Sequence, residues 1–180
     1  MLASLGEIKK RAKKIKLVAM DVDGVLTNGD IVVLESGEEV KNWSSKDRLL
    51  MALIRSKKIP LTIAWITGRQ SKAVEWGAKD LSIPYLVQKC GQKKEALETI
   101  LKKEKITPQE TVFIGDDIID LPALKLAGLS ACPKDAVPEV LKTCDYVSPL
   151  EGGKGVVRDV LEIILKAQNK WDDILNSFSH

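Results

Sequence analysis

Two short segments of the sequence place several carboxylates directly after an apolar run. The segment "KLVAMDVDG" contains Asp21 and Asp23, and the segment "TVFIGDDIID" contains Asp116, Asp117 and Asp120. If Asp21, Asp23 and Asp116 converge in the fold, like charges a few ångströms apart raise one another's pKa unless a cation lies between them. Carboxylate oxygens without soft ligands favour Mg²⁺, which typically binds one or two carboxylates together with a substrate phosphate. The two segments therefore predict a Mg²⁺ site.

Two other segments offer groups that suit a phosphate. The segment "ITGR" supplies Thr67, Gly68 and Arg69, and "QKCGQKKEAL" supplies Lys93. A threonine hydroxyl and a lysine ammonium donate to phosphate oxygens, and backbone amides that enter a helix after Thr67 add an anion-binding end. A carboxylate can attack phosphorus to form an aspartyl phosphate that water hydrolyses. Asp23 would then protonate the leaving alcohol and later take a proton from the attacking water.

Each segment has a simpler structural interpretation when it is considered alone. "ITGR" could form a turn in which Thr67 caps a helix, and "GDDIID" could be an acidic helix N-terminus. Lys94 is a rival to Lys93, since the two are adjacent. A calcium-binding EF-hand is rejected, because its glycine and glutamate positions would fall on Leu26 and Val32. The four segments together, in order after successive apolar runs, favour the catalytic interpretation.

The apolar runs that precede these segments predict strands of a parallel sheet. Six such runs are continuous rather than alternating, and they cover residues 16–20, 59–66, 84–87, 111–114, 129–132 and 145–147. Stretches with helical spacing between them predict helices on both faces of the sheet. This alternation predicts a doubly wound, Rossmann-like α/β fold, in which polar residues at the strand ends line the ligand crevice.

Two segments depart from this alternation. Residues 29–43, "GDIVVLESGEEVKNW", predict a β-hairpin that follows the first strand and projects beside the carboxyl ends of the strands. Residues 155–168 predict an amphipathic helix, after which "NKWDDILNSFSH" forms a tail with exposed apolar residues that hint at a partner surface. No internal repeat or low-complexity segment is visible.

Length and composition favour one globular domain that spans residues 1–180. The chain is 44% hydrophobic and 4% aromatic with a net charge of +3, which argues against base stacking on nucleic acid. The basic run "EIKKRAKKIK" predicts the solvated face of a helix, with nucleic-acid binding as the weaker alternative. No stretch approaches the roughly 20 apolar residues of a membrane helix, and three widely spaced cysteines with one histidine predict neither a zinc site nor a disulfide framework. We therefore expect a cytoplasmic protein that binds neither nucleic acid nor membrane.

The four polar segments resemble, in order and placement, the four motifs of the haloacid dehalogenase superfamily of phosphotransferases. The resemblance implies that Asp21 is the nucleophile, that Asp23 is the acid/base with its backbone carbonyl on Mg²⁺, and that Asp116 is a direct metal ligand. The other residues implied by the resemblance bind phosphate or support the metal indirectly: Thr67 and Lys93 for phosphate, Asp117 and Asp120 for the metal.

The spacing of the segments leaves no room for the cap domain that is inserted in many members of the superfamily. In this respect, and in "DGVLTNG", "GGKGVVRDV" and "KAQNKWD", the chain is similar to the capless 3-deoxy-D-manno-octulosonate 8-phosphate (Kdo 8-phosphate) phosphatases. Members of that group are homotetramers whose hairpins meet at the centre, so the resemblance implies a homotetramer and a role in lipopolysaccharide sugar synthesis.

The segment that should recognise the sugar departs from this group. The group usually has N-x-R-D-G after the hairpin, with further basic residues downstream, whereas this chain has "SSKDRLLMA". Lys46 and Asp47 fit the pattern, Arg48 replaces the glycine, and Ala52 and Gly77 stand where basic residues are expected. A sugar-acid carboxylate needs a cationic partner, which Lys46, Arg48 or Arg69 would supply from new positions.

These features lead to one expectation and two alternatives. We expect a Mg²⁺-dependent phosphomonoesterase that acts on a phosphorylated acidic sugar, with Kdo 8-phosphate as the first choice. The 9-phosphate of a nine-carbon keto acid of the sialate or KDN type is the alternative substrate. A non-catalytic module that keeps the tetrameric fold is a further alternative, against which the intact Asp21, Asp23, Lys93 and Asp116 argue.

Overall fold

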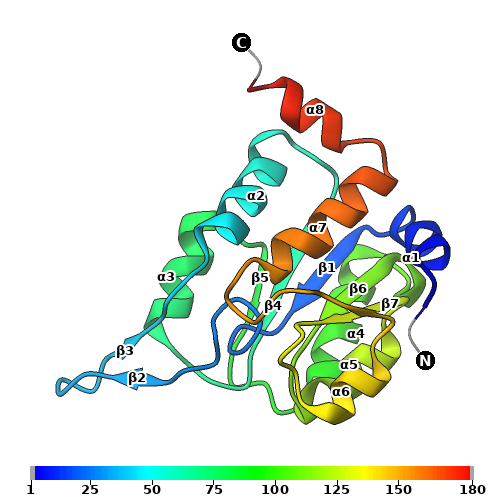
Figure 1. Ribbon diagram of the computed structural model, residues 1–180. Coiled ribbons are helices and arrows are strands. Elements are labelled where there is room, and N and C mark those ends of the chain that lie inside the picture. Colours follow the sequence, from blue (N-terminus) through cyan, green and yellow to red (C-terminus); the bar gives the residue numbers. More distant parts are fainter. Residues whose placement is uncertain (1–2, 179–180) are drawn as a thin grey trace.

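A six-stranded parallel sheet forms the centre of the molecule (Figure 1). The computed structural model describes residues 3–178 of the chain. In spatial order the strands are β5 (Tyr85–Val87), β4 (Thr62–Ile66), β1 (Leu17–Met20), β6 (Thr111–Ile114), β7 (Leu129–Cys132) and β8 (Tyr146–Val147). Every neighbouring pair is parallel, and the order reverses at β1, as it does in doubly wound sheets. The predicted α/β class and the six predicted strands are confirmed.

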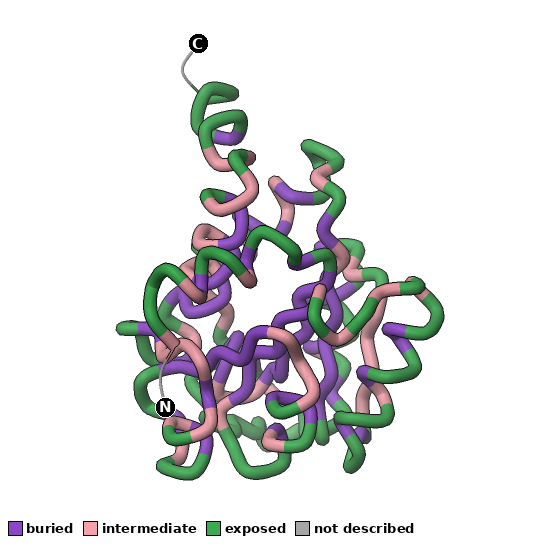
Figure 2. The backbone as a smooth tube through the Cα atoms, turned by 90° about the vertical axis from the view of Figure 1, so that its right-hand side faces the viewer, coloured by how far each residue is buried: buried purple, intermediate pink, exposed green. Residues whose placement is uncertain are grey.

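Helices cover both faces of the sheet because the strands are apolar on both. One face carries α1 (Leu5–Ala12), α2 (Ser45–Ser56), α3 (Lys72–Leu81) and α7 (Val156–Ala167), and the other carries α4 (Lys93–Glu104), α5 (Leu121–Leu126) and α6 (Pro138–Thr143). Within β1, Val18 and Met20 pack against the first group while Leu17 and Ala19 pack against the second. Figure 2 shows the resulting buried interior inside an exposed outer layer. Burial on both faces explains why the strands are continuous apolar runs.

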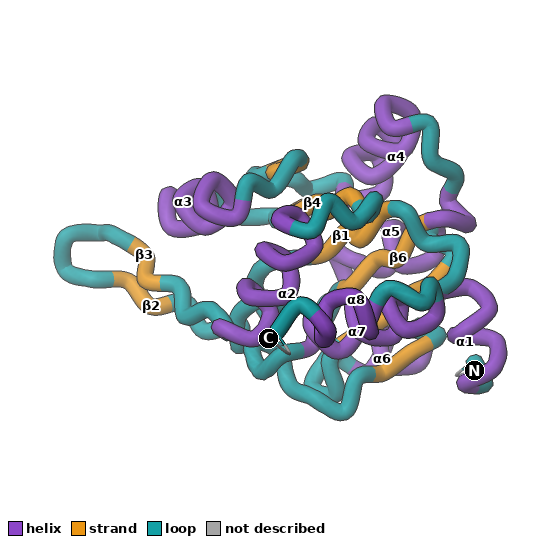
Figure 3. Tube along the Cα trace, turned by 90° about the horizontal axis from the view of Figure 1, so that it is seen from above, coloured by secondary structure: helices purple, strands orange, loops and turns teal. Residues whose placement is uncertain are grey.

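A β-hairpin projects from the body of the molecule after β1 (Figures 1 and 3). Its strands, β2 (Val32–Val33) and β3 (Glu39–Val40), pair antiparallel with each other. Its arms expose apolar side chains, with exposed fractions of 44% to 57% at Ile31, Val32, Val33, Leu34 and Val40. Between β1 and β4 the described chain adds only this hairpin and α2, so these residues contain no separate cap domain. The predicted hairpin and the capless architecture are confirmed.

A glycine-rich loop, residues 151–155, fixes the loop that follows β1. A Cβ at Gly152 would lie 2.1 Å from the backbone oxygen of Gly24, and one at Gly153 would lie 2.7 Å from the backbone nitrogen of Asn28. The Gly153 N–H donates to the backbone oxygen of Val25 at 3.0 Å. Only glycine permits backbones to approach so closely. Since α7 begins directly after this loop, α7 and residues 24–28 are held together.

The described chain ends just after α8 (Trp171–Asn176), which packs on α7 through the buried Ile174 (Figure 1). Leu175 and Phe178 are 49% and 64% exposed, which confirms the predicted apolar tail as far as residue 178. Residues 179 and 180, which include the single histidine, lie outside the described residues. None of the helices in residues 3–178 is long and apolar enough to cross a membrane.

Candidate active site

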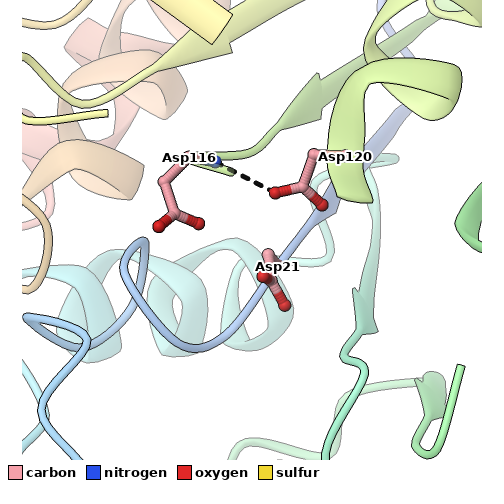
Figure 4. Close-up of side chains that lie close together, drawn as sticks. All are labelled: Asp21, Asp116 and Asp120. Carbon is pink, nitrogen blue, oxygen red and sulfur yellow. Dashed lines mark hydrogen bonds between the residues drawn. The ribbon is translucent and has the colours of Figure 1, made fainter. Parts of the chain in front are cut away.

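The carboxyl ends of β1 and β6 bring three aspartates together (Figure 4). Asp21 directly follows β1, and its backbone N–H donates to the carbonyl of Ile114 in β6 at 2.9 Å. Asp116 lies two residues beyond β6, and Asp120 is the last residue of the 3₁₀ turn η2 (Ile118–Asp120). One carboxylate oxygen of each aspartate lies within 4.8 Å of the other two. The fold thus brings Asp21 and Asp116 together, as their places at neighbouring strand ends predict.

Lys93, the first residue of α4, places a cation between two of these carboxylates. Its Nζ lies 2.8 Å from Asp21 Oδ2 and 2.6 Å from Asp120 Oδ1, and its side chain is fully buried. Burial lowers the pKa of Lys93, but the charges of Asp21 and Asp120 outweigh burial and hold this pKa above its ordinary value. Lys94, the rival in the sequence, is exposed and pairs with Glu98. The lysine that reaches the carboxylates is therefore Lys93.

Asp120 is completely buried, and both of its carboxylate oxygens have partners. Oδ1 accepts from Lys93, and Oδ2 accepts from the backbone N–H groups of Asp116 at 3.0 Å and Asp117 at 3.3 Å. Asp117 is exposed, and its own carboxylate accepts from the Ile118 N–H at 2.6 Å. Asp120 therefore orients Lys93 and the loop that carries Asp116, a role that agrees with indirect support of a metal.

The surroundings of Asp116 fit a bound cation. Its Oδ1 is buried and has no hydrogen-bond partner among the described residues. Burial, together with the charges of Asp21 and Asp120, raises the pKa of Asp116 to about 8, and burial with the charge of Asp120 raises the pKa of Asp21 to about 7. Gly24 has φ +84°, and a Cβ there would lie 2.0 Å from Asp116 Oδ2. Crowded carboxylate oxygens without soft ligands are a donor set that fits Mg²⁺, with Asp21 and Asp116 as the residues to hold it.

The loop after β4 carries the threonine of the second predicted segment. Thr67 is 2% exposed, and its Oγ1 accepts from the Arg69 N–H at 3.4 Å. The next helix, α3, begins only at Lys72, because the N-cap Ser71 is extended and its N–H donates to Gln88 Oε1 at 2.7 Å. The expectation that the amides after Thr67 enter a helix is therefore wrong, since Gly68 and Arg69 lie in a bend that precedes α3. For the same reason Thr67 does not cap α3.

Asp23 contacts a lysine that the sequence pattern did not single out. Lys41 directly follows β3 of the hairpin, its side chain is 1% exposed, and it forms an ion pair with Asp23. The same ammonium lies 3.6 Å from Glu39 Oε2, and Glu39 also pairs with Arg69. A lysine in a projecting hairpin is normally solvated, so no sequence signal distinguishes Lys41 from its neighbours. The hairpin thus reaches the predicted acid/base residue from within the same chain.

A cavity of about 850 Å³, here called the basic cavity, lies beside α2 and the end of the hairpin. Its basic lining residues are Lys41, Lys46, Arg48 and Arg158. Arg48 forms an ion pair with Asp80, which also lines the cavity. Since Lys41 contacts Asp23 as well as the cavity, the structure places Lys46 and Arg48 in a basic surface that adjoins the predicted acid/base.

Asp47, in the first turn of α2, faces the N-terminus of α7. It does not line the basic cavity. It is 1% exposed, and its Oδ1 accepts from the backbone N–H of Arg158 at 2.7 Å. Its Oδ2 is buried without a hydrogen-bond partner among the described residues. Burial raises the pKa of Asp47 to about 6, although the bond from Arg158 opposes this shift. Asp47 therefore joins α2 to α7, and a contact between Asp47 and a sugar stays a prediction.

Comparisons with known sequences match hydrolases of one family. A family model described as haloacid dehalogenase-like hydrolase matches residues 85–160. The 3-deoxy-D-manno-octulosonate 8-phosphate phosphatase KdsC of Escherichia coli strain K12 is 36% identical over 167 residues, which cover 93% of this chain and 88% of that protein. The KdsC of Yersinia pestis is 38% identical over 167 residues, which cover 92% of this chain and 88% of that protein.

Solved structures agree with the sequence comparisons. A crystal structure of 3-deoxy-D-manno-octulosonate 8-phosphate phosphatase from Moraxella catarrhalis, in complex with magnesium, phosphate and KDO, has a TM-score of 0.93 at 37% identity and covers 98% of this chain and 100% of its own. The cobalt-bound phosphatase of Haemophilus influenzae has a TM-score of 0.84 at 33% identity, with coverage of 89% and 92%. Both of these similar proteins hold a divalent metal.

Proposed function

We propose, from the premise that this chain belongs to the haloacid dehalogenase-like phosphatases of the KdsC type, that it hydrolyses Kdo 8-phosphate in a Mg²⁺-dependent reaction. The observation that carries the proposal is the buried pair of Asp21 and Lys93 beside Asp116. Three crowded carboxyl groups share one ammonium, which raises the pKa values of Asp21 and Asp116, and a bound divalent cation would allow both to ionise. A non-catalytic module has no need of such a cluster, so the cluster favours the enzyme.

Asp21 is the nucleophile of the proposed reaction. Attack of its carboxylate on phosphorus forms an aspartyl phosphate and breaks the bond to the sugar oxygen. Its Oδ1 accepts from the Val22 N–H at 2.7 Å, and its Oδ2 lies 2.8 Å from Lys93 Nζ. These two contacts hold the carboxylate in one orientation, which lowers the entropic cost of attack. The Lys93 charge also stabilises the negative oxygens of the transferring group.

Asp23 moves the proton in both steps. It gives a proton to the departing sugar oxygen, and it then takes one from the water that attacks the aspartyl phosphate, which releases phosphate and restores Asp21. Successive residues of an extended chain point to opposite sides, so the two aspartates can have different tasks. When bound by Asp21, Asp116 and the backbone carbonyl of Asp23, Mg²⁺ supplies positive charge to the phosphate oxygens.

The loop after β4 completes the phosphate site in this proposal. Thr67 follows the strand that pairs with β1, in a register that places Trp65 beside Met20. Thr67 and Asp21 therefore emerge at the same edge of the sheet. We assign the buried Thr67 hydroxyl and the backbone N–H groups of the exposed Gly68 and Arg69 to phosphate oxygens, since hydrogen-bond donors at this edge suit an anion.

The basic cavity supports an acidic sugar as the substrate. Lys46 and Arg48 line it, and they are the residues that we assign to the sugar carboxylate. Ala52, which also lines the cavity, and Gly77 supply no charge where related phosphatases are expected to have one. This difference keeps the nine-carbon keto-acid 9-phosphate as the alternative substrate.

A homotetramer is the assembly that we propose. The exposed apolar arms of the hairpin support it, because contiguous exposed apolar side chains mark interaction surfaces. Light scattering that gave the mass of a monomer would overturn this assembly. The three buried, free cysteines agree with a reducing cytoplasm, which stays a prediction.

A substrate panel tests the function. We expect kcat/KM for Kdo 8-phosphate to exceed that for the nine-carbon 9-phosphate by at least about tenfold, which is about 1.4 kcal/mol of transition-state discrimination. Turnover should require Mg²⁺ and disappear with EDTA. Asp21→Asn, which keeps the side-chain size, should lose at least about 10³-fold in kcat, as expected for a lost nucleophile. A preference for the nine-carbon ester would select the alternative substrate, and a pure wild-type protein without Mg²⁺-dependent turnover would refute the enzyme.

A further inference from the structure

Lys41 is a buried lysine at the end of a hairpin whose residues 31–38 and Val40 are exposed. Its neighbour Val40 is 44% exposed, whereas the Lys41 side chain is 1% exposed. The hairpin chain therefore turns inward at this residue, and the ammonium meets the Asp23 carboxylate. A buried lysine charge is costly unless carboxylates compensate it, so burial of Lys41 requires its ion pair with Asp23.

A second carboxylate completes the surroundings of Lys41. Glu39 Oε2 lies 3.6 Å from the Lys41 ammonium, and Glu39 Oε1 pairs with the guanidinium of Arg69. The four side chains form a continuous ion-pair chain in the order Asp23, Lys41, Glu39 and Arg69. This chain connects the loop after β1 to the loop after β4 through the end of the hairpin. Both loops carry groups that the proposed reaction uses.

We propose that Lys41 is a positioning residue that holds the Asp23 side chain in place for proton transfer, with its ammonium on Oδ1 while Oδ2 gives or takes the proton. The inference deepens the proposed function and rests on it. A short side chain such as Asp23 has few rotamers, and a fixed ion-pair partner selects one of them. Proton transfer requires contact at hydrogen-bond distance, and a misplacement of about 1 Å can cost about 10²-fold in rate. The hairpin is thereby a working part of the site within a single chain.

Lys41 is distinct from the cations that we assign to the sugar. Its ammonium is already shared by Asp23 and Glu39, and it is removed from solvent. Lys46, in contrast, is exposed on the wall of the basic cavity. Loss of Lys41 should therefore lower kcat, whereas loss of a sugar-binding cation should raise KM.

A double-mutant cycle on 4-nitrophenyl phosphate tests the positioning role. Lys41→Met is made in the wild type and in Asp23→Asn, and kcat and KM are measured with Mg²⁺. We expect Lys41→Met to lower kcat at least about tenfold in the wild type, with KM changed less than about threefold, because only proton transfer is disturbed. In the Asp23→Asn background the same substitution should change kcat by less than about twofold, since Lys41 acts through Asp23.

Conservative and matched variants complete the design. Lys41→Arg keeps a cation and should recover most of the kcat lost in Lys41→Met. Lys134→Met removes a lysine that is 51% exposed and paired with Glu151, and it should leave kcat within about twofold, as surface ion pairs contribute little. Circular dichroism and thermal unfolding report on the fold of each variant. If Lys41→Met does not fold, Lys41→Gln, which keeps a hydrogen-bond donor, takes its place in the cycle.

Two outcomes overturn the positioning role. The first is wild-type kcat in a folded Lys41→Met, and the second is an equal loss of kcat in the wild-type and Asp23→Asn backgrounds. Wild-type turnover with Mg²⁺ combined with either outcome refutes the role of Lys41 and leaves the proposed function intact. A wild-type protein without turnover refutes the proposed function itself.

Discussion

The carboxylate cluster of Asp21, Asp116, Asp120 and Lys93 differs from the basic cavity in how its charges are held. Lys93 in the cluster is fully buried between two carboxylates. In the cavity, the side chain of Arg48 is 26% exposed and that of its partner Asp80 is 69% exposed. A buried ion pair is strongly destabilised when one partner is removed, whereas an exposed pair contributes little. Under the proposed function, catalysis would therefore depend on a rigid, buried cluster, and the choice of substrate on a more exposed and adjustable surface.

The largest expected effect tests the carboxylate cluster. Lys93→Met should lower kcat/KM about 10³-fold, because it removes charge stabilisation of the transition state. It also leaves Asp21 and Asp120 without their cation, so the free energy of unfolding should fall by about 3 kcal/mol. Steady-state kinetics and urea denaturation measure the two quantities.

Lys94→Met is the matched control for this substitution. Lys94 is adjacent in sequence, but it is 51% exposed and pairs with Glu98. Activity and stability should both stay close to wild type. Equal effects of the two substitutions would contradict the assignment of Lys93 as the lysine of the cluster.

Mg²⁺ binding should depend on pH through the same cluster. The pKa values of Asp21 and Asp116 in the metal-free protein are raised to about 7 and about 8, so both carboxyls carry protons at pH 6. Bound Mg²⁺ requires the deprotonated forms, and its binding must release these protons. The affinity for Mg²⁺ should therefore increase from pH 6 to pH 8 and level off above that range. Calorimetric titration in two buffers of different ionisation enthalpy measures the affinity and the released protons, and pH-independent binding without proton release would contradict the cluster as the metal site.

Asp47 provides a smaller effect on stability. Its pKa in the folded protein is raised to about 6 from an ordinary value of 3.8, so the folded state binds the proton more tightly. Stability from this group is greatest below pH 3.8 and is lost as pH rises through 6. Asp47→Asn keeps an acceptor for the Arg158 N–H and cannot ionise. Above pH 6 it should be more stable than wild type by on the order of 2 kcal/mol.

Urea denaturation between pH 4 and pH 7 measures this difference. The two proteins should converge in stability at the acidic end and separate as pH rises. Parallel stability curves would show that ionisation of Asp47 does not destabilise the folded protein. Asp47→Ala separates the loss of the hydrogen bond from the Arg158 N–H from the loss of charge.

The smallest expected effect tests the basic cavity. Arg48→Ala should lower kcat/KM for Kdo 8-phosphate about tenfold, mainly through KM, because a carboxylate contact binds ground and transition states alike. The same variant should hydrolyse 4-nitrophenyl phosphate, which has no carboxylate, at the wild-type rate. Equal losses on both substrates would remove Arg48 from the sugar site.

The cluster could be predicted from sequence because it depends on strand ends. A buried parallel strand is a continuous apolar run, so the polar residues at its end are conspicuous, and Asp21, Thr67 and Asp116 are such residues. Parallel neighbours then place these ends at one edge without further information. The choice between Lys93 and Lys94 needed the structure, since helix phase alone decides which of them is buried.

The surroundings of the cavity could not be predicted in this way. Asp47 bonds to the backbone of a residue 111 positions away, and Arg48 pairs with Asp80 on another helix. Lys41 is buried only because the hairpin turns inward at its end. Such contacts depend on tertiary packing between helices and loops, which no local pattern encodes. The start of α3 at Lys72, rather than directly after Thr67, depends on a contact of the same kind, because the Ser71 N–H donates to the Gln88 side chain.

Trapping of the phosphoryl group on the protein tests the central claim most directly. Asp23→Asn lacks the base that activates water, so an aspartyl phosphate formed from 4-nitrophenyl phosphate should accumulate on this variant. Acid quench followed by peptide mass spectrometry locates the added phosphoryl group. The account predicts one phosphoryl group on the peptide that contains Asp21, formed only with Mg²⁺ and absent from the double variant with Asp21→Asn. Phosphorylation of another residue, or nitrophenol released by Asp23→Asn over many turnovers without any phosphorylated Asp21, would contradict it.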